Sequence, residues 1–249
     1  GMVLKDGGKM SKSVGNVVSR EEIVGKYGAD TARLFILFAA PPEKDLEWSD
    51  QGVEGSYRFL KRVWNIVGKY EDIQTEEKGK LSSDEFALRR KLHQTIKKVT
   101  EDLDGKFAFN TAISAIMELV NDMYRFIEAH DTIEASLSGE LVRNLLILLA
   151  PFVPHMTEEL WQSAGQKEES IHLAAWPACD ESALVVDEVE LAVQVNGKVR
   201  ATISVPIAMA REEIGEKAQA LPEIQKFTEG KTIVKVIVVP KRIVNIVVK

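Results

Sequence analysis

The residues with the clearest capacity for chemistry lie near the start of the chain, in the run GGKMSKSVGN at positions 7–16. Two ammonium groups and two hydroxyls fall within five positions, and the flanking glycines give the backbone freedom to follow a moving charge. This composition suits a loop that binds an anion. It is not a P-loop, because Gly8 and Gly15 have the wrong spacing and no Lys-Ser pair follows Gly15. The alternative is a solvated surface loop rich in lysine and serine.

The letters KMSKS at positions 9–13 resemble the signature of class I aminoacyl-tRNA synthetases. An unrelated chain of this length would contain this string roughly once in ten thousand cases. The resemblance implies a mobile loop that stabilises the pyrophosphate leaving group of ATP during amino-acid adenylation. The ATP-binding residues that it implies are Lys9, Met10, Ser11, Lys12 and Ser13.

The resemblance also assigns individual roles within this loop. Lys12 is expected to approach the ATP phosphates most closely, with Lys9 assisting, so these two are the expected catalytic residues. Ser11 and Ser13 are expected to shape the loop. Val14 departs from the family pattern, which commonly has lysine before Gly-Asn, so one neighbouring positive charge is missing here.

The bulk composition is that of an ordinary soluble protein. With 249 residues and 45% hydrophobic content, the chain can form one or two domains with a sizeable core. Cys179 is the only cysteine, so no disulfide framework or cysteine-based zinc site is expected. The longest apolar stretch, 145–153, is interrupted by Pro151 and is too short to span a bilayer. With no basic leader before an apolar stretch, we expect a cytoplasmic protein without membrane contact.

The net charge of −6 argues against a protein that coats nucleic acid without selectivity. Positive charge is nevertheless unevenly distributed. The segment 187–249 holds ten Lys or Arg against eight Asp or Glu, so it is slightly positive within an acidic chain. Local binding of a polyanion therefore remains possible.

Hydrophobic periodicity predicts short helices first and then a helical bundle. Ser19 and Glu22 form a capping-box pattern before one helix, and Asp30 is expected to cap a second that ends at Pro41-Pro42. Apolar residues then recur at steps of three and four from Val53 onward. The expected starts of the four long helices are Ser49, Ser82 with Glu85 as a capping box, Asn110 and Ser138. Short connections between long amphipathic helices predict an antiparallel bundle.

The period changes to two after residue 186. Alternating apolar residues on both sides of Asn196-Gly197 predict a β-hairpin, followed by helical segments and two final strands. The fold class is therefore mainly α, with an antiparallel bundle followed by a small α+β domain of ββαββ type. The predicted divisions are 1–48 for the loop and connecting helices, 49–165 for the bundle, 166–186 for a linker or crossing loop, and 187–249 for the tail.

Five further strings extend the resemblance to essentially the whole chain. In order, they are similar to the C-terminal part of bacterial leucyl-tRNA synthetases: FILFAAPPEKDLEWSD, FAFNTAISAIMELVND, LLAPFVPHMTEELW, LAVQVNGKVR and VVPKRIVNIVV. The resemblance implies a bundle of the class Ia anticodon-binding type and a C-terminal tRNA-binding domain. It also implies a C-terminal fragment that is inactive alone, because the His-Ile-Gly-His signature, leucine pocket and editing domain of the family are absent from these residues.

The partners implied by the resemblance are tRNA(Leu), ATP with Mg²⁺, and leucine bound by the missing upstream domain, in a monomeric enzyme whose C-terminal part binds no metal. The expected phosphate contacts are basic residues on helices or turns. They are Lys198, Arg200, Lys241, Arg242, Arg89 and Arg90. For each, ordinary surface decoration is the alternative.

Two other functions remain open from the sequence. One is a stand-alone tRNA- or RNA-binding module made of the bundle and the tail. The other is a synthetase for another branched aliphatic amino acid, isoleucine or valine. A helical scaffold for protein partners would explain neither the lysine loop nor the basic turns of the tail.

Overall fold

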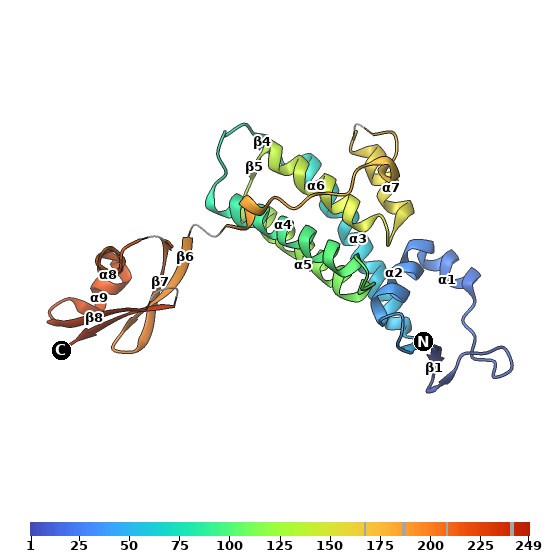
Figure 1. Cartoon of the computed structure of the whole chain (residues 1–249), viewed down its shortest axis with the longest axis horizontal. Helices are drawn as coiled ribbons and strands as arrows, with labels where there is room; N and C mark the ends of the chain where they lie inside the picture. The colour runs from blue at the N-terminus through green and yellow to red at the C-terminus, as the bar shows by residue number, and fades with distance from the viewer. Residues whose placement is uncertain (167, 186–187, 208, 240–241) are drawn as a thin grey trace. The chain divides into compact units, whose positions relative to one another are not determined.

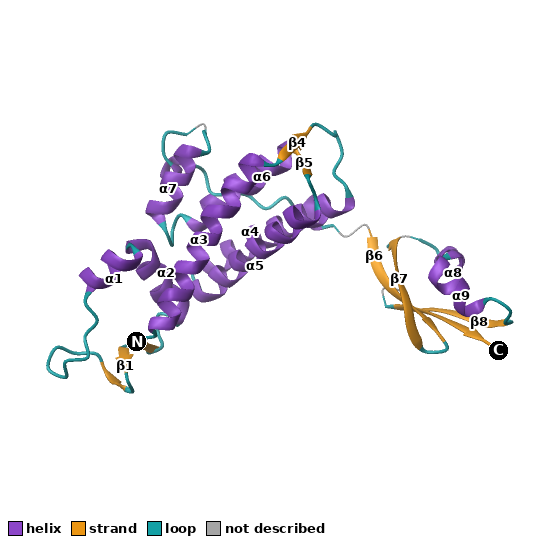
Figure 2. Ribbon diagram, turned by 180° about the vertical axis from the view of Figure 1, so that it is seen from behind, coloured by secondary structure: helices purple, strands orange, loops and turns teal. Residues whose placement is uncertain are grey.

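The computed structural model describes residues 1–166, 168–185, 188–207, 209–239 and 242–249. These residues form two compact units, Gly1–Leu184 and Val185–Lys249, and Figure 1 labels most of their elements. Figure 2 shows that most helices belong to the first unit, while the longer strands belong to the second. Among the described residues, every helix is too short or too polar to cross a membrane.

The first unit begins with a small sheet and two short helices. Its first elements are β1 (Val3–Lys5), β2 (Gly8–Lys9), α1 (Arg20–Tyr27), α2 (Ala29–Ala39) and β3 (Leu46–Glu47). β1 pairs with β2 in antiparallel and with β3 in parallel fashion. Ser19 accepts a hydrogen bond from the Glu22 amide at 3.3 Å, so the predicted start of α1 is confirmed. The acidic side chain that Ser19 contacts is that of Glu21, to which its hydroxyl donates at 2.8 Å, rather than that of Glu22 as the predicted capping box required. Trp48 packs edge-on against Phe35 with ring centroids 5.1 Å apart.

The sequence predicted that Asp30 caps its own helix, and this prediction is wrong. α2 begins one residue earlier, at Ala29, and the Asp30 side chain is directed at another helix. Its carboxylate accepts hydrogen bonds from the backbone amides of His155 (3.5 Å) and Met156 (2.6 Å). These amides belong to the first turn of α7 (Pro154–Ser163), where a carboxylate also offsets the helix dipole. Asp30 therefore attaches α7 to α2.

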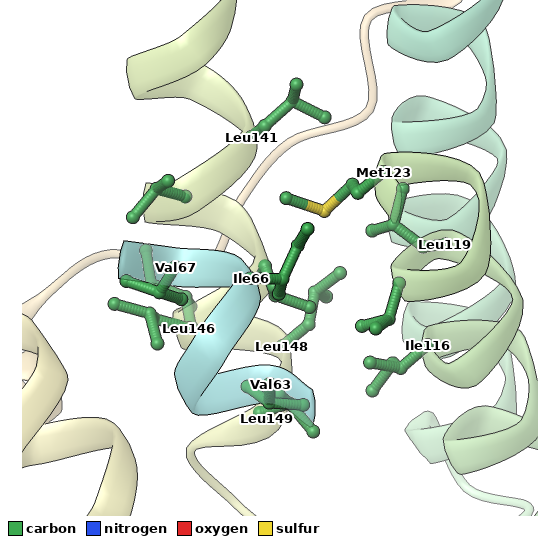
Figure 3. Packing of buried hydrophobic residues seen from close by; sticks show 14 of the residues in the cluster. Val63, Ile66, Val67, Ile116, Leu119, Met123, Leu141, Leu146, Leu148 and Leu149 are labelled. Carbon is green, nitrogen blue, oxygen red and sulfur yellow. The ribbon is translucent and has the colours of Figure 1, made fainter. Parts of the chain in front are cut away.

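Four long helices form the body of the first unit. They are α3 (Asp50–Asp72), α4 (Ser83–Leu103), α5 (Phe109–Ala129) and α6 (Ala135–Leu149). Figure 3 shows Val63, Ile66 and Val67 of α3 directed into a buried cluster with residues of α5 and α6. Two short strands, β4 (Gln74–Glu76) and β5 (Thr132–Glu134), pair in parallel at one end.

Two of the predicted helix starts are confirmed and two are wrong. Ser49 caps α3, and Ser82 with Glu85 forms a complete capping box at α4. Asn110 lies inside α5, which begins at Phe109. Ser138 lies inside α6 because the carboxylate of Glu134 caps that helix earlier, accepting from the Leu137 amide at 3.0 Å.

The segment 166–184, placed with a linker by the sequence, packs against the bundle in its described part. Ile171 and Ala183 are 2% and 1% exposed. They belong to two short 3-10 helices, η1 (Ile171–Leu173) and η2 (Glu181–Leu184). The Asp180 amide donates to Nδ1 of His93 on α4 at 3.1 Å. This part of the chain therefore belongs to the first unit up to Leu184.

The second unit has two helices between two pairs of strands. Its elements are β6 (Glu188–Val195), β7 (Lys198–Pro206), α8 (Arg211–Ala220), α9 (Pro222–Thr228), β8 (Ile233–Val239) and β9 (Ile243–Val248). The sheet order is β7-β6-β9-β8, and within the described residues of this sheet β6 and β9 are the only parallel pair. Alternate strand residues pack with α8 and α9 in one core. Asn196 (φ 49°) and Gly197 (φ 79°) form the predicted hairpin turn.

Candidate functional site

A β-hairpin positions the first lysine of the KMSKS run. Asp6 and Gly7 have φ angles of 57° and 75°, which are suited to a tight turn between β1 and β2. The strands pair Leu4 with Lys9, and the Met10 amide continues the pairing by donating to the Val3 carbonyl at 3.0 Å. Lys9 is therefore fixed at the end of a strand, where the loop begins.

Asn16 closes the loop at its other end. Its Oδ1 accepts from the Ser11 amide at 2.9 Å, and its Nδ2 lies 3.3 Å from the carbonyl oxygens of both Lys5 and Lys9. One side chain thus joins the start of the loop, its middle and the β-hairpin. We name residues 9–16 the lysine loop. The sequence alone does not reveal this role of Asn16, because an asparagine after glycine is equally typical of an ordinary turn.

The two lysines of the lysine loop are available for a ligand. Lys9 and Lys12 are both exposed, and within the described parts of the chain no carboxylate lies within ion-pair distance of either. The hydroxyls of Ser11 and Ser13 lie 3.1 Å apart. Met10 is half-buried and Val14 is 68% exposed. Two unpaired ammonium groups beside two hydroxyls form a local cationic site that can bind phosphate oxygens.

The basic residues of the second unit that were predicted to contact tRNA are divided between two separate turns. Lys198 and Arg200 are exposed next to the hairpin turn, and the Arg200 guanidinium lies over the Phe227 ring at 4.3 Å. Arg242 is exposed beside the other turn, whereas Lys241 lies outside the described residues. β6 ends at Val195, next to the hairpin turn, and β9 begins at Ile243, next to the other turn. The register pairs Ile243 with Ala192, three residues before Val195, so the two turns are separated by about 10 Å along the strands.

Arg89, expected to contact tRNA phosphates, is held by two carboxylates of the protein. Its guanidinium donates to Glu140 at 2.7 and 3.1 Å and to Asp180 at 3.0 Å. Burial raises the pKa of Glu140, but hydrogen bonds from His93 and Arg89 outweigh this effect, so the pKa is lowered overall. Hydrogen bonds from Ser182 and then from Arg89 lower the pKa of Asp180 to about 2. Arg89 therefore contributes to the attachment of the segment around Asp180.

Other basic residues of α4 are also engaged within the bundle. Lys91, Lys97 and Lys98 pair with carboxylates at 2.7, 3.1 and 2.6 Å. Arg90 lies over the Phe86 ring at 5.2 Å, and its buried Nε has no hydrogen-bond partner in the described structure. The basic sequence of α4 therefore provides little unpaired charge.

The histidines do not form a metal site. Among the described residues there is no group of three or more His, Cys, Asp or Glu side chains placed to hold a metal ion. His93 is buried, with Nδ1 accepting from the Asp180 amide and Nε2 lying 3.0 Å from Glu140. Its two ring nitrogens are therefore both used in structural hydrogen bonds.

With this geometry established, comparison with known proteins identifies the family. The family described as "Anticodon-binding domain of tRNA ligase" matches residues 85–214, which is more than half of the chain. The chain belongs to this family. The family described as "tRNA synthetases class I (I, L, M and V)" matches residues 1–49, which include the whole lysine loop. The anticodon-binding match begins in the first turn of α4 and continues into α8.

Individual relatives match the chain over its full length, and both that follow are leucine enzymes. It is 51% identical to the leucine–tRNA ligase of Thioalkalivibrio sulfidiphilus (strain HL-EbGR7), with 100% of the chain aligned to 31% of that protein. It is 32% identical to the LeuRS of Agrobacterium radiobacter K84, solved as a ternary complex with tRNA and LeuAMS. That likeness has a TM-score of 0.69 and covers 100% of this chain and 32% of the other.

A more distant structure shares the fold alone. The methionyl-tRNA synthetase of Mycobacterium tuberculosis, solved with methionyl-adenylate, is 22% identical with a TM-score of 0.54, over 66% of this chain and 37% of the other. The chain spans about a third of the length of the leucine relatives that it matches. It is a homologue of part of a leucine–tRNA ligase.

Proposed function

We propose that the chain is the part of a leucine–tRNA ligase that supplies the lysine loop and the tRNA-binding units. The complete enzyme activates leucine with ATP and esterifies it to tRNA(Leu). The leucine and adenosine pockets belong to other parts of such an enzyme. The 249 residues alone are then inactive in adenylation, because the reaction requires several groups positioned together.

The observation that carries the proposal is the pair of exposed, unpaired ammonium groups, Lys9 and Lys12, in an intact KMSKS run closed by Asn16. When the leucine carboxylate attacks the α-phosphorus of ATP, negative charge develops on the departing pyrophosphate. An ammonium group that meets this charge more strongly in the transition state than in the ground state accelerates the step. Lys12 acts in this way and Lys9 assists, while Met10, Ser11 and Ser13 form the rest of the ATP contact.

Mg²⁺ is expected with ATP from the family resemblance. Since the described residues lack a cluster of metal-ligating side chains, no residue of this chain is assigned to it. Mg²⁺ would reach the reaction with the ATP phosphates or through other parts of the enzyme. The cation chemistry assigned to this chain is that of its lysines.

The remaining parts of the proposal concern tRNA. The helices form the antiparallel bundle of the class Ia anticodon-binding type, and the tail is a ββαββ-type tRNA-binding domain that uses Lys198, Arg200, Lys241 and Arg242. The two separated basic turns support contacts to separate phosphates rather than to one. We also propose that the enzyme is monomeric and cytoplasmic, as the resemblance implies.

Amino-acid-dependent pyrophosphate exchange by a full-length protein that carries this chain tests the proposal. We expect exchange with leucine and little with isoleucine or valine, and no exchange by the 249-residue chain alone. Preference for isoleucine or valine would support the alternative synthetase. Exchange by the isolated chain would contradict its role as a partial unit, whereas tRNA binding without any exchange by the full-length protein would favour an RNA-binding module.

A further inference from the structure

One helix of the bundle carries a positively charged face to which the sequence analysis gave no role. Residues 58–69 of α3 contain four basic residues and no Asp or Glu, in a chain whose net charge is −6. The opposite side of this helix carries the side chains that enter the buried core (Figure 3). We name the basic residues the α3 cationic face. They are Arg58, Lys61, Arg62 and Lys69.

This charge is largely unpaired. Arg58 approaches the Glu54 carboxylate only at 4.0 Å, and the two side chains are 67% and 55% exposed, so the pair is weak in water. In the described parts of the chain, no carboxylate lies within ion-pair distance of Lys61, Arg62 or Lys69. The face therefore keeps most of its positive charge.

Uncharged neighbours hold these cations in place. Lys61 Nζ lies 4.5 Å from the Tyr57 ring centre. Arg62 and Lys69 lie 4.9 and 5.4 Å from the centre of the Tyr124 ring. Contacts of this kind at exposed sites are weak and leave the charge able to attract an anion.

An exposed tryptophan lies beside the cations. Trp64 is 46% exposed, and it follows Lys61 by three residues, so the two side chains are neighbours on the helix surface. The indole offers a flat apolar surface of the kind on which an unpaired base stacks. A basic helix face with an exposed aromatic side chain combines the two features that single-stranded nucleic acid binds.

The acidic surroundings show that this charge is local. Asp50 and Glu54 precede the face, and Glu71 and Asp72 follow it. A partner must therefore meet about three turns of helix with negative charge and present a flat ring there. An acidic protein segment would satisfy the charge, whereas RNA satisfies the charge and also supplies flat bases that can stack on the exposed indole.

We propose that the outward face of α3 binds RNA, with Arg58, Lys61 and Lys69 contacting phosphates and Trp64 stacking on an unpaired base. Arg62 supports the face structurally, since its side chain donates to Asn121 Oδ1 at 2.7 Å. The proposal rests on the proposed function, in which the RNA is a tRNA. It adds a binding surface separate from the basic turns of the second unit.

The test compares two triple variants of the 249-residue chain. Arg58→Gln, Lys61→Gln and Lys69→Gln together remove three charges from α3. The matched control, Lys91→Gln, Lys97→Gln and Lys98→Gln, removes three charges from α4 that are already paired with carboxylates. Binding of an unmodified tRNA(Leu) transcript is measured over a salt series, with circular dichroism melts to verify folding.

We expect the α3 variant to bind more weakly and to lose about 2 to 3 from the slope of log affinity against log salt, at 0.7–0.9 per phosphate contact. The α4 control should keep a slope within about 0.5 of the wild type. Wild-type affinity and slope in the folded α3 variant would overturn the proposal. If the triple variant unfolds, each single α3 variant should still lower the slope by about 0.7–0.9, and three unchanged slopes would overturn it.

Trp64 provides an independent measurement. Trp64→Ala should weaken binding about tenfold without altering the salt slope, while Trp64→Phe should retain most of the affinity. Equal binding by all three proteins would overturn the stacking part. The proposed function fails separately, because pyrophosphate exchange by the full-length enzyme does not depend on these residues. If the full-length enzyme catalyses exchange but the α3 variants bind tRNA like the wild type, only the proposal of an RNA-binding surface on α3 is wrong. An acidic protein partner then becomes the alternative.

Discussion

Helices α3 and α4 of the same bundle carry similar numbers of basic residues in very different surroundings. On α4, Lys91, Lys97 and Lys98 each pair with a carboxylate. On α3, Lys61 and Lys69 meet aromatic rings instead. The number of basic residues in a helix therefore does not predict how much unpaired positive charge a binding partner encounters.

The difference indicates two separate uses of charge in this protein. Paired groups such as Arg89 with Glu140 and Asp180 attach segments of the first unit to one another. Unpaired groups, in the lysine loop and on α3, remain available for phosphate. Removing a paired group should therefore lower stability, while removing an unpaired one should lower binding or catalysis and leave stability nearly unchanged.

The largest effect is expected at Lys12. In the full-length enzyme, Lys12→Ala should lower kcat for adenylate formation about 10²–10³-fold, and by more than it raises KM, because the ammonium acts mainly on charge that develops in the transition state. Pyrophosphate exchange measured over a range of ATP concentrations gives both constants. A variant with normal adenylate formation and altered tRNA affinity alone would show that the phosphate role is wrong.

The next effect concerns Glu85, a paired carboxylate that is 1% exposed. Burial raises its pKa, but the amides of Ser82 and Glu134, the Ser82 hydroxyl and Lys78 together lower it to about 2 from 4.5. Because the folded pKa is depressed, this contribution to stability is complete above about pH 4.5 and is lost as the pH falls toward 2.

The Glu85→Gln variant tests this pH dependence. Near pH 7 it should unfold more easily than the wild type by on the order of 3 kcal/mol, and the difference should shrink steadily below pH 4.5. Urea unfolding of both proteins at a series of pH values measures it. A difference that stays constant down to pH 2.5 would contradict the ionised role of the carboxylate.

A smaller loss is expected at Glu140, whose side chain is 26% exposed. Glu140→Ala leaves the Arg89 guanidinium and the His93 ring without this acceptor, so the free energy of unfolding should fall by about 1–3 kcal/mol. Glu118→Ala is the matched control, because the Glu118 side chain pairs with Lys91 but is 66% exposed. This substitution should lower the free energy of unfolding by less than about 1 kcal/mol. Equal losses in the two variants would indicate that burial of the pair is unimportant.

The smallest effect is expected in the second unit. Lys198→Ala with Arg200→Ala should weaken tRNA binding and lower its salt slope by up to about 1.4–1.8, with leucine activation unchanged when it is measured without tRNA. Arg200 also covers Phe227, so circular dichroism must verify folding. If affinity and slope both stay at wild-type values in the folded variant, these residues only decorate the hairpin.

Local signals in the sequence predicted much of the fold. Ser49 and Ser82 cap helices, and Asn196-Gly197 makes a hairpin, because each of these depends on residues within a few positions. Ser138 failed because the nearby Glu134 carboxylate caps α6 earlier in the chain. Asp30 failed because its hydrogen-bond partners, at residues 155–156, come from a distant part of the chain. Pattern reasoning cannot find such tertiary partners.

The candidate site was likewise predictable only where it depends on residues close together in the sequence. The string KMSKS pointed to Lys9 and Lys12, but the three hydrogen bonds of Asn16 that close the loop depend on a hairpin at Asp6-Gly7 that was not predicted. Arg89 appeared as free as Arg58 in the sequence. Only the fold brings Glu140 and Asp180 to the former.

Lysine labelling with and without tRNA tests most directly whether lysines without a carboxylate partner bind tRNA while lysines paired with carboxylates do not. The chain is treated briefly with acetic anhydride, and each lysine is quantified by mass spectrometry. Pairing with Glu181 raises the pKa of Lys97, so Lys97 should react slowly whether or not tRNA is present. Lys61 and Lys69 should react readily in the free chain and become protected when tRNA binds. Protection of Lys91 and Lys97 by tRNA, with Lys61 and Lys69 unchanged, would contradict the account.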